Sequence, residues 1–219
     1  MKILALELSS AQGGIAWLDT ERQSARAPTA TRESVCAPQP EGFVREWPND
    51  RKNSGPFFEH LAGVQKGFGK ADRIIVGLGP GSYAGTRIAI SAAIGLQAAS
   101  QARLIGFPSI CAIECDANEY CVIGDARRQA FFFARIRDHG LIQGPDLMTE
   151  AELREKLDKF ERRMPIFATE RLSQFDRAEF RYPSSRVLAR LAGDLVRDFS
   201  QPPLEPMYLR EPHITIPRK

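Results

Sequence analysis

A glycine-rich segment between a short apolar run and a small-residue helical pattern constrains the fold more than any other part of the sequence. It reads Gly77-Leu-Gly-Pro-Gly-Ser-Tyr-Ala-Gly85. The run before it, Arg73 to Val76, is typical of a buried strand, and the stretch after it, Thr86 to Ala99, is typical of a helix crowded with Ala, Ser and Gly. A strand, a glycine loop and a helix in this order predict an α/β protein.

Three familiar functional loops do not fit this segment. It is not a P-loop, because no G-x4-G-K-[ST] is present and Arg87 is the only cation nearby. It is not the dinucleotide fingerprint, because the third glycine position falls on Ser82. It is not a nucleophile elbow, because Pro80 precedes Gly81 and Ser82. Two hypotheses stay open on the residues alone: a phosphate cradle of backbone N–H groups, and a tight turn that lets a helix pack close to the sheet.

The first half of the chain otherwise predicts a hairpin, a long loop and a helix. Met1 to Leu8 is an apolar strand, and Gly13-Gly14 predicts a hairpin turn before a return strand over Ile15 to Leu18. Residues 20–53 have few periodic apolar positions and predict a long loop with one edge strand near 25–30. A helix capped by Asn53 or Ser54 follows. Its apolar residues are Phe57, Phe58, Leu61, Val64 and Phe68.

The second half repeats the order of strands followed by helices. Its predicted elements are a strand over 103–106, a helix opened by Pro108 and Ser109, strands over 120–123 and 130–137, a helix from the capping box at Thr149 to Phe160, a strand over 164–168 and a helix over 185–199. We therefore expect two similar lobes, residues 1–105 and 106–219, each with a mixed β-sheet flanked by helices.

Composition excludes several classes of protein. Over 219 residues, 43% are hydrophobic and 26% charged, which is typical of a folded globular protein and not of a disordered or collagen-like chain. The net charge of +3 is too small to predict nucleic-acid binding by itself. No apolar run reaches the roughly 20 residues that span a bilayer. These features predict a cytoplasmic protein without a membrane segment.

The cysteines and histidines do not predict a metal site. Cys111, Cys115 and Cys121 follow no familiar zinc or iron–sulfur spacing, and reduced thiols packed as small apolar residues are the expectation. The three histidines are isolated, and neither HExxH nor HxxxH occurs. We therefore expect no metal and no cofactor on this chain.

Four motifs resemble one known family. The segment from Gly77 through Arg87 is similar to the signature G-x-G-P-G-S-[FY]-T-G-x-R of the bacterial TsaB (YeaZ) family, often labelled glycoprotease-like. The opening strand Lys2 to Ser10, the turn Asp125-Ala-Arg-Arg128 and the C-terminal Met207-Tyr-Leu-Arg210 resemble further motifs of that family. The resemblance implies an actin-like (ASKHA, RNase H-like) two-lobed fold. The signature-loop residues are Gly77, Gly79, Pro80, Gly81, Ser82, Tyr83, Gly85 and Arg87.

The resemblance also implies a function in tRNA processing. Members of the TsaB family assist the formation of threonylcarbamoyladenosine beside the anticodon, and a homologous partner, TsaD, carries the transfer, the ATP and the metal. The implied role is a non-catalytic scaffold that forms a heterodimer with a TsaD-type homologue and is joined by a TsaE-type ATPase. A homodimer of the free protein is a further expectation, and contact with tRNA is expected to be indirect or weak. No catalytic residue is assigned.

The sequence departs from the family pattern at several positions. The acidic residue after the first strand is Glu7 where Asp is usual, and Ala84 replaces a Thr of the signature. Asn53-Ser54-Gly55 stands where His-Ser-Glu is usual. These changes affect a ligand role of the first lobe more than a scaffold role.

The two helices of the first lobe carry the candidate partner interface. Small residues on the second of them would let a helix approach closely. The alternative is that both helices only cover their own sheet. The candidate interface residues are Phe57, Phe58, Leu61, Val64, Ile88, Ala92, Gly95 and Ala99.

Two enzyme hypotheses remain as alternatives. An ATP-dependent phosphotransferase of the same fold would use Glu7 with Gly13-Gly14, and Asp125 in the other lobe. A peptidase finds no metal motif and no convincing Ser–His or Cys–His pair. The arginines are scattered along the chain, and the sequence leaves open whether any of them converge on one phosphate-binding surface.

Overall fold

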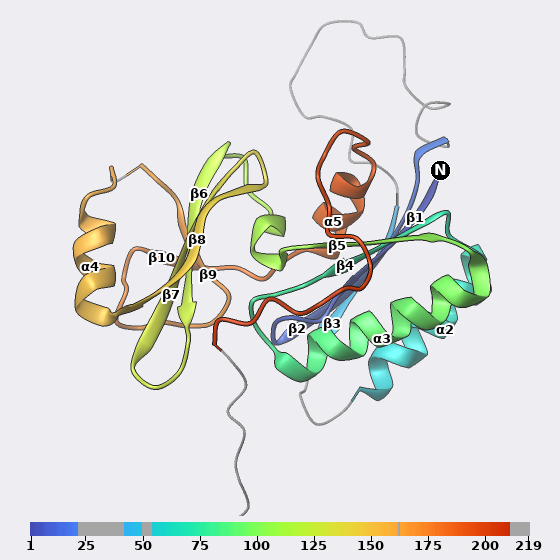
Figure 1. Ribbon diagram of the computed structural model, residues 1–219, viewed down its shortest axis with the longest axis horizontal. Coiled ribbons are helices and arrows are strands. Elements are labelled where there is room, and N and C mark those ends of the chain that lie inside the picture. Colours follow the sequence, from blue (N-terminus) through green and yellow to red (C-terminus); the bar gives the residue numbers. More distant parts are fainter. Residues whose placement is uncertain (22–41, 50–53, 162, 211–219) are drawn as a thin grey trace, which may run out of the picture. The chain divides into compact units, whose positions relative to one another are not determined.

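The computed structural model describes residues 1–21, 42–49, 54–161 and 163–210 (Figure 1). It divides into two compact units, Met1–Asp116 with Arg181–Pro206, and Ala117–Phe180 with Met207–Lys219. The boundary expected after residue 105 is too early, because Ser109 and Ile110 are fully buried and Ser109 hydrogen-bonds to the glycine loop of the first unit. Residues 181–206 also return to that unit, so the second half is not one continuous lobe.

The first unit contains a five-stranded mixed sheet in the order β3-β2-β1-β4-β5. β1, β4 and β5 are parallel, and β2 and β3 join the edge as antiparallel strands. β1 and β4 are almost wholly buried, as their continuous apolar runs require for strands covered on both faces. The strands are β1 (Lys2–Glu7), β2 (Gln12–Asp19), β3 (Phe43–Pro48), β4 (Arg73–Gly77) and β5 (Arg103–Phe107).

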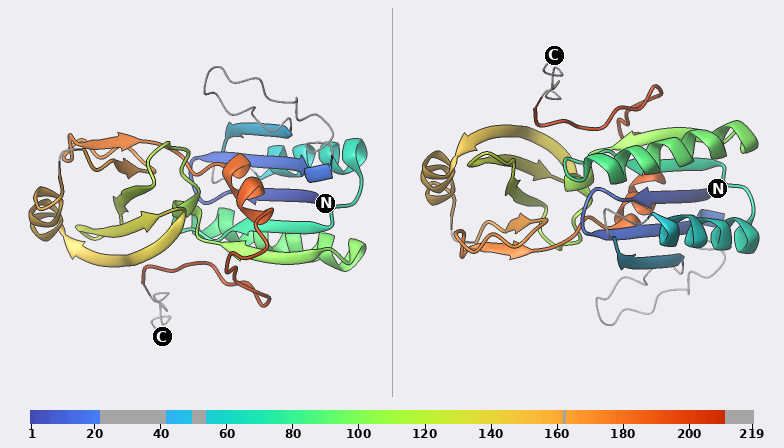
Figure 2. Two further views of the ribbon diagram at one scale, coloured as in Figure 1. Left: turned by 90° about the horizontal axis from the view of Figure 1, so that it is seen from above. Right: turned by 90° about the horizontal axis from the view of Figure 1, so that it is seen from below.

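Helices cover both faces of this sheet. α2 (Gly55–Phe68) and α3 (Tyr83–Ser100) lie on one face, and α5 (Ser185–Ala192) packs on β1, β2 and β4 from the other (Figures 1 and 2). The α2–α3 side encloses an extensive apolar core, in which Trp17, Trp47 and Phe57 are buried. Buried Arg73 donates a hydrogen bond to the carbonyl of Ala192 at the end of α5, where the helix dipole favours a cation.

The second unit contains a second mixed sheet in the order β10-β9-β6-β7-β8. α4 (Glu150–Asp158) covers one face through Leu153 and Leu157, and it begins with the predicted capping box at Thr149 and Glu152. The strands are β6 (Glu119–Asp125), β7 (Ala130–Arg137), β8 (Gly140–Thr149), β9 (Ile166–Ala168) and β10 (Ala178–Phe180). The predicted α/β class, with a mixed sheet flanked by helices in each of two units, is confirmed.

Several predicted elements are wrong. Gly13 and Gly14 lie inside β2 and form no turn. Glycine is needed at position 13 for packing, because a Cβ there would sit 2.5 Å from the Trp47 ring. Residues 43–48 form β3, which the sequence analysis assigned to a loop. The helix expected after Pro108 is a short 3₁₀ helix, Ser109–Ala112. The last helix ends at Ala192 instead of residue 199. The predicted edge strand near 25–30 lies outside the described residues.

No helix among the described residues is long and apolar enough to cross a membrane.

Candidate functional site

The glycine loop connects the end of β4 to the start of α3 and lies against the end of β1. Gly79 has a φ of +92°, a backbone conformation that favours glycine. The Ser82 side chain caps α3 by accepting a hydrogen bond from the Gly85 N–H at 3.2 Å. The predicted order of strand, loop and helix is therefore present at this segment.

Two further glycines are required by close approach to β1. A Cβ on Gly81 would lie 2.0 Å from the Ser9 carbonyl oxygen, and a Cβ on Gly85 would lie 2.1 Å from the Leu8 carbonyl oxygen. Real Cβ atoms essentially never come within 3.0 Å of a neighbouring atom. Any larger residue at either position would push the loop away from the sheet.

Backbone N–H groups of the loop are bonded inside the protein. Ser82 N donates to the Ser9 carbonyl at 2.6 Å, Gly79 N donates to the Ser109 hydroxyl at 2.9 Å, and Thr86 N donates to the Ser82 carbonyl at 3.0 Å. A phosphate cradle needs such groups turned toward a ligand. The geometry therefore favours the second sequence hypothesis, a tight turn that packs a helix against the sheet.

Glu7 is the buried acidic group beside this loop. Its side chain is fully buried, and its Oε1 accepts a hydrogen bond from the Ser9 N–H at 2.7 Å. No hydrogen-bond donor among the described residues pairs with Oε2. Burial raises the pKa of Glu7 above its ordinary value, and the hydroxyls of Ser9 and Ser109 oppose this shift. The carboxyl has room only because residue 77 is glycine, since a Cβ there would lie 1.8 Å from Oε2.

The charged end of the signature faces solvent. Arg87 and Tyr83 are both exposed, and the guanidinium carbon of Arg87 lies 3.9 Å from the centre of the Tyr83 ring. This cation–π contact holds the two side chains together on the first turn of α3. Gly81 and Ala84 are the other exposed positions of the signature, so Tyr83 and Arg87 supply its large solvent-facing side chains.

The structure separates the eight candidate interface residues into two groups. Phe57, Leu61 and Val64 are at most 5% exposed and belong to the core of their own unit, so the expectation that they contact a partner is wrong. Ile88 and Ala92 are partly buried against the same core. Phe58, Gly95 and Ala99 face solvent.

The solvent side of α3 is unusual for a surface helix. Residues 88–100 contain no charged side chain. Ile94, which the sequence analysis did not select, is 50% exposed, and Phe58 on α2 is 49% exposed. We define the α2–α3 face by its exposed residues Phe58, Ile94, Gly95, Ala98 and Ala99. An amphipathic surface helix carries charges on its outer side, so this face is apolar where solvent would favour polar residues.

The candidate phosphotransferase residues of the first unit are neighbours but form no phosphate loop. Glu7 pairs with Gly14 across β1 and β2, and both glycines lie inside β2, Gly14 against the Ser185 side chain and Gly13 against Trp47. In the second unit, Asp125 pairs with the Arg127 guanidinium at 2.8 Å. No group of three or more His, Cys, Asp or Glu side chains suited to a metal ion is found in the part of the chain that the structure describes.

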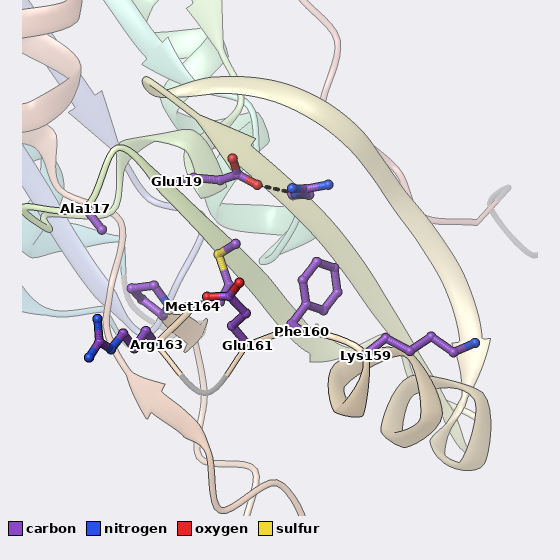
Figure 3. A pocket seen from close by; sticks show the side chains of 9 residues that line it. Ala117, Glu119, Lys159, Phe160, Glu161, Arg163 and Met164 are labelled. Carbon is purple, nitrogen blue, oxygen red and sulfur yellow. Dashed lines mark hydrogen bonds and ion pairs between the residues drawn. The ribbon is translucent and has the colours of Figure 1, made fainter.

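A hollow of about 480 Å³ opens on the second unit between β6, β7 and the end of α4 (Figure 3). Glu119 lies on one wall and accepts hydrogen bonds from Arg135 and, at 2.8 Å, from Arg137. The Arg137 bond, followed by that of Arg135, lowers the pKa of Glu119. Phe160 lies under the Arg135 guanidinium at 5.5 Å. Glu119 and Arg135 of this hollow are thus paired with each other, whereas Lys159 pairs with Glu155 outside it.

A small apolar cavity of about 160 Å³ lies in the first unit beneath α2 and α3. Leu4, Trp17, Val64, Ile74 and Leu96 are among its lining residues. It lies beneath the α2–α3 face.

Comparisons with known proteins agree with the resemblance found in the sequence. A sequence model of the family described as TsaD, tRNA N6-adenosine threonylcarbamoyltransferase, matches residues 57–202. No curated protein matches the sequence.

Two solved structures from Pseudomonas aeruginosa are similar in fold. One is an uncharacterized protein with similarity to peptidase YEAZ, with a TM-score of 0.70 and 17% identity over 95% of this chain and 99% of that chain. The other is YeaZ, with a TM-score of 0.63 and 17% identity over 88% of this chain and 91% of that chain. At this identity the likeness concerns the fold, and the predicted resemblance to YeaZ is confirmed at that level.

Proposed function

The chain belongs to the TsaD family, tRNA N6-adenosine threonylcarbamoyltransferase, and on that premise we propose that it is a non-catalytic partner that activates a TsaD-type transferase. The family is one of tRNA modification, and the product is threonylcarbamoyladenosine beside the anticodon. The observation that carries the proposal is the uncharged solvent side of α3, residues 88–100, with its exposed Ile94, Gly95, Ala98 and Ala99. In this proposal the ATP and the metal belong to the transferase, and a TsaE-type ATPase joins the two proteins.

The α2–α3 face has the chemistry of a helix-docking surface. Gly95 and Ala98 have little or no side chain, so a second helix can approach the α3 backbone closely. Ile94 and Phe58 supply apolar side chains, and about half of the surface of each is exposed to solvent in the free chain. Covering such side chains stabilises a complex by about 25 cal/mol for each Å² of apolar area removed from water. A homologous chain with its own small-residue helix is the partner that fits this surface.

The residues near the glycine loop support a non-catalytic role. The full sequence contains no H-x3-H pair of the kind that holds the metal in the transferase. The N–H groups of Gly79, Ser82, Gly85 and Thr86, which a phosphate cradle would turn toward its ligand, are bonded to Ser109, Ser9 and Ser82. Glu7 is closed off from solvent. The alternative, an ATP-dependent phosphotransferase, needs both a phosphate-binding loop and an accessible carboxylate, and so has less support.

Light scattering after size-exclusion chromatography tests the proposal. The chain would be mixed with the TsaD-type homologue of the same organism, and we expect a peak with the mass of a complex that contains both chains. Gly95→Arg should weaken the complex at least tenfold, because a long charged side chain would stand on the docking surface. The free chain should tolerate the change, since nothing lies within 4 Å of the added Cβ. Phe58→Asp should act in the same direction.

The matched control is Val196→Arg. Val196 is 95% exposed and follows α5, which covers the opposite face of the sheet, so this change also places an arginine at an exposed apolar position. It should leave the complex intact. No complex at micromolar concentration, with or without ATP, would contradict the proposal, as would equal weakening by the control.

A further inference from the structure

Two segments far apart in the sequence meet in the second unit. One is the turn from Asp125 to Ala130 between β6 and β7, and the other is the C-terminal segment Met207 to Arg210. The Arg210 guanidinium donates a hydrogen bond to the backbone carbonyl of Arg127 at 3.4 Å. Both segments are among the four motifs that resemble the TsaB family, and their contact brings Arg127, Arg128 and Arg210 together.

The backbone of the turn is held in an uncommon conformation. Arg127, Arg128 and Gln129 have φ values of +64°, +54° and +60°, a region that glycine and asparagine favour. The turn is closed by the Ala126 N–H, which donates to the Ala130 carbonyl at 2.8 Å. Three consecutive residues with large side chains are costly in this conformation, and such strain is typical of functional sites. The side chains at this turn therefore call for a functional explanation.

The charges of the turn leave two guanidinium groups available. Asp125 engages Arg127 twice, accepting from its backbone N–H at 2.6 Å and from its guanidinium at 2.8 Å. Arg128 is exposed, and within the described residues it makes no hydrogen bond or ion pair. Arg210 is exposed as well and has a carbonyl, not a carboxylate, as its acceptor. The Glu170 carboxylate also lies at the turn, where it accepts from the Asp125 backbone N–H at 3.0 Å. Among the described residues, neither Arg128 nor Arg210 forms an ion pair with an acidic group, so the turn presents two unpaired arginines.

We propose that this turn is a contact site for the phosphate backbone of RNA. Arg128 and Arg210 bind phosphate oxygens, for which the planar guanidinium offers paired N–H donors. Arg127 is a positioning residue, because its ion pair with Asp125 fixes the turn. The choice of RNA as the polyanion rests on the proposed function, since a partner of a tRNA-modifying enzyme works beside a tRNA substrate. The site makes direct tRNA contact a property of this chain.

Fluorescence anisotropy with a labelled tRNA transcript tests the site. The full chain, alone and mixed with the TsaD-type homologue, would be titrated against the transcript between 50 and 300 mM salt. The double variant Arg128→Ala with Arg210→Ala should lower the salt dependence, the slope of log K against log salt, by about 1.5, since each phosphate contact contributes about 0.7 to 0.9. At 50 mM salt the same relation predicts roughly 100-fold weaker binding. Arg128→Lys should keep most of the slope, because it keeps the charge.

Arg163→Ala is the matched control. Arg163 is exposed and, within the described residues, makes no hydrogen bond or ion pair. It lines the hollow beside Glu119, which is the other end of β6 from the turn and about 20 Å away at 3.3 Å per residue. Removing its charge should leave the slope within about 0.3 of the unsubstituted protein. An equal loss in the control would mean that general charge, not the turn, binds RNA, and would overturn the inference.

Other outcomes also decide the inference. An unchanged slope in the double variant, or no binding at 50 mM salt by the chain or the mixture, would overturn it. So would a double variant that loses ATP binding but keeps RNA binding, because the turn would then serve a nucleotide. Light scattering on the same mixture separates the two proposals. If the two proteins form a complex and the double variant binds RNA as tightly as the unsubstituted chain, only the RNA site is excluded. If no complex forms but the double variant loses RNA binding, only the partner role is excluded.

Discussion

Replacing Gly77 by alanine tests whether the glycine signature exists to accommodate a buried carboxyl. The added Cβ would lie 1.8 Å from Glu7 Oε2 and 2.6 Å from the Ser109 hydroxyl oxygen. Both neighbouring side chains are fully buried, so neither can swing into solvent. Glu7 would have to move, and its hydrogen bond from the Ser9 N–H would lengthen or break.

The expected loss is about 4 kcal/mol in the free energy of unfolding. Roughly 2 kcal/mol comes from overpacking a closed site, and roughly 2 kcal/mol from a weakened hydrogen bond to a buried acidic group. The assay is urea unfolding followed by tryptophan fluorescence. Both tryptophans of the chain, Trp17 and Trp47, are buried in the core of the first unit, so their emission reports the unit that contains Gly77.

A double-mutant cycle and a control make the reasoning refutable. In a Glu7→Ala background no Glu7 hydrogen bond is left to break, while the new methyl group still meets the Ser109 hydroxyl at 2.6 Å, so we expect Gly77→Ala to cost at least about 2 kcal/mol less there. Gly95→Ala, on the exposed side of α3 with nothing within 4 Å of its Cβ, should stabilise the protein by about 0.5 to 1 kcal/mol. If Gly77→Ala costs under about 1 kcal/mol, or the same in both backgrounds, the carboxyl does not explain the glycine.

Two further predictions concern buried titratable groups. Burial raises the pKa of Glu7 above 4.5 in the folded protein. The native state therefore holds this proton more tightly than the unfolded chain does. The resulting stabilisation is full below about pH 4.5 and is lost as the pH rises through the folded pKa. Glu7→Gln, which does not titrate, should therefore raise the melting temperature more at pH 8 than at pH 4, and an equal change at both would contradict this. Burial also raises the pKa of Cys111 to about 12 and of Cys121 to about 11. At pH 8 iodoacetamide should label partly exposed Cys115 well before either of them, as peptide mass spectrometry would show, and equal labelling would mean that this core is open.

The sequence predicted the local order around the glycine loop but not the contacts that require it. A strand, a loop and a helix follow from the residues on either side of Gly77. The contacts of Gly81 and Gly85 with Ser9 and Leu8 join positions about 70 residues apart in the chain. No local pattern contains them, so the residues alone left the phosphate cradle and the structural turn equally open.

Helical periodicity identified the core instead of the proposed partner surface. Phe57, Leu61 and Val64 follow the helical repeat and are buried against their own sheet. Phe58 is out of phase with that repeat, and it is the exposed one. A better signal for the interface was available in α3, where residues 88–100 carry no charge. A helix covering only its own sheet needs an apolar inner side, not an uncharged outer side.

Two of the strands missing from the predictions and one misplaced helix end have separate physical explanations. β3 was missed because its residues 43–48 show no alternation of apolar and charged side chains, and it is stabilised by pairing with β2. β8 was missed because Gly144 and Pro145 interrupt its alternation. α5 ends at Ala192, and the helix-breaking Gly193 directly after it was the signal that could have predicted this end.

The measurement that tests the central claim most directly is the formation of threonylcarbamoyladenosine in a tRNA transcript, followed by mass spectrometry of its nucleosides. The chain, the TsaD-type homologue and the TsaE-type ATPase would be assayed separately, in pairs and together with a threonylcarbamoyl donor and ATP. We predict no product from this chain alone, and a rate for the full mixture at least tenfold above that of the mixture without it. Product formed by this chain alone, or an equal rate without it, would contradict a non-catalytic activating partner.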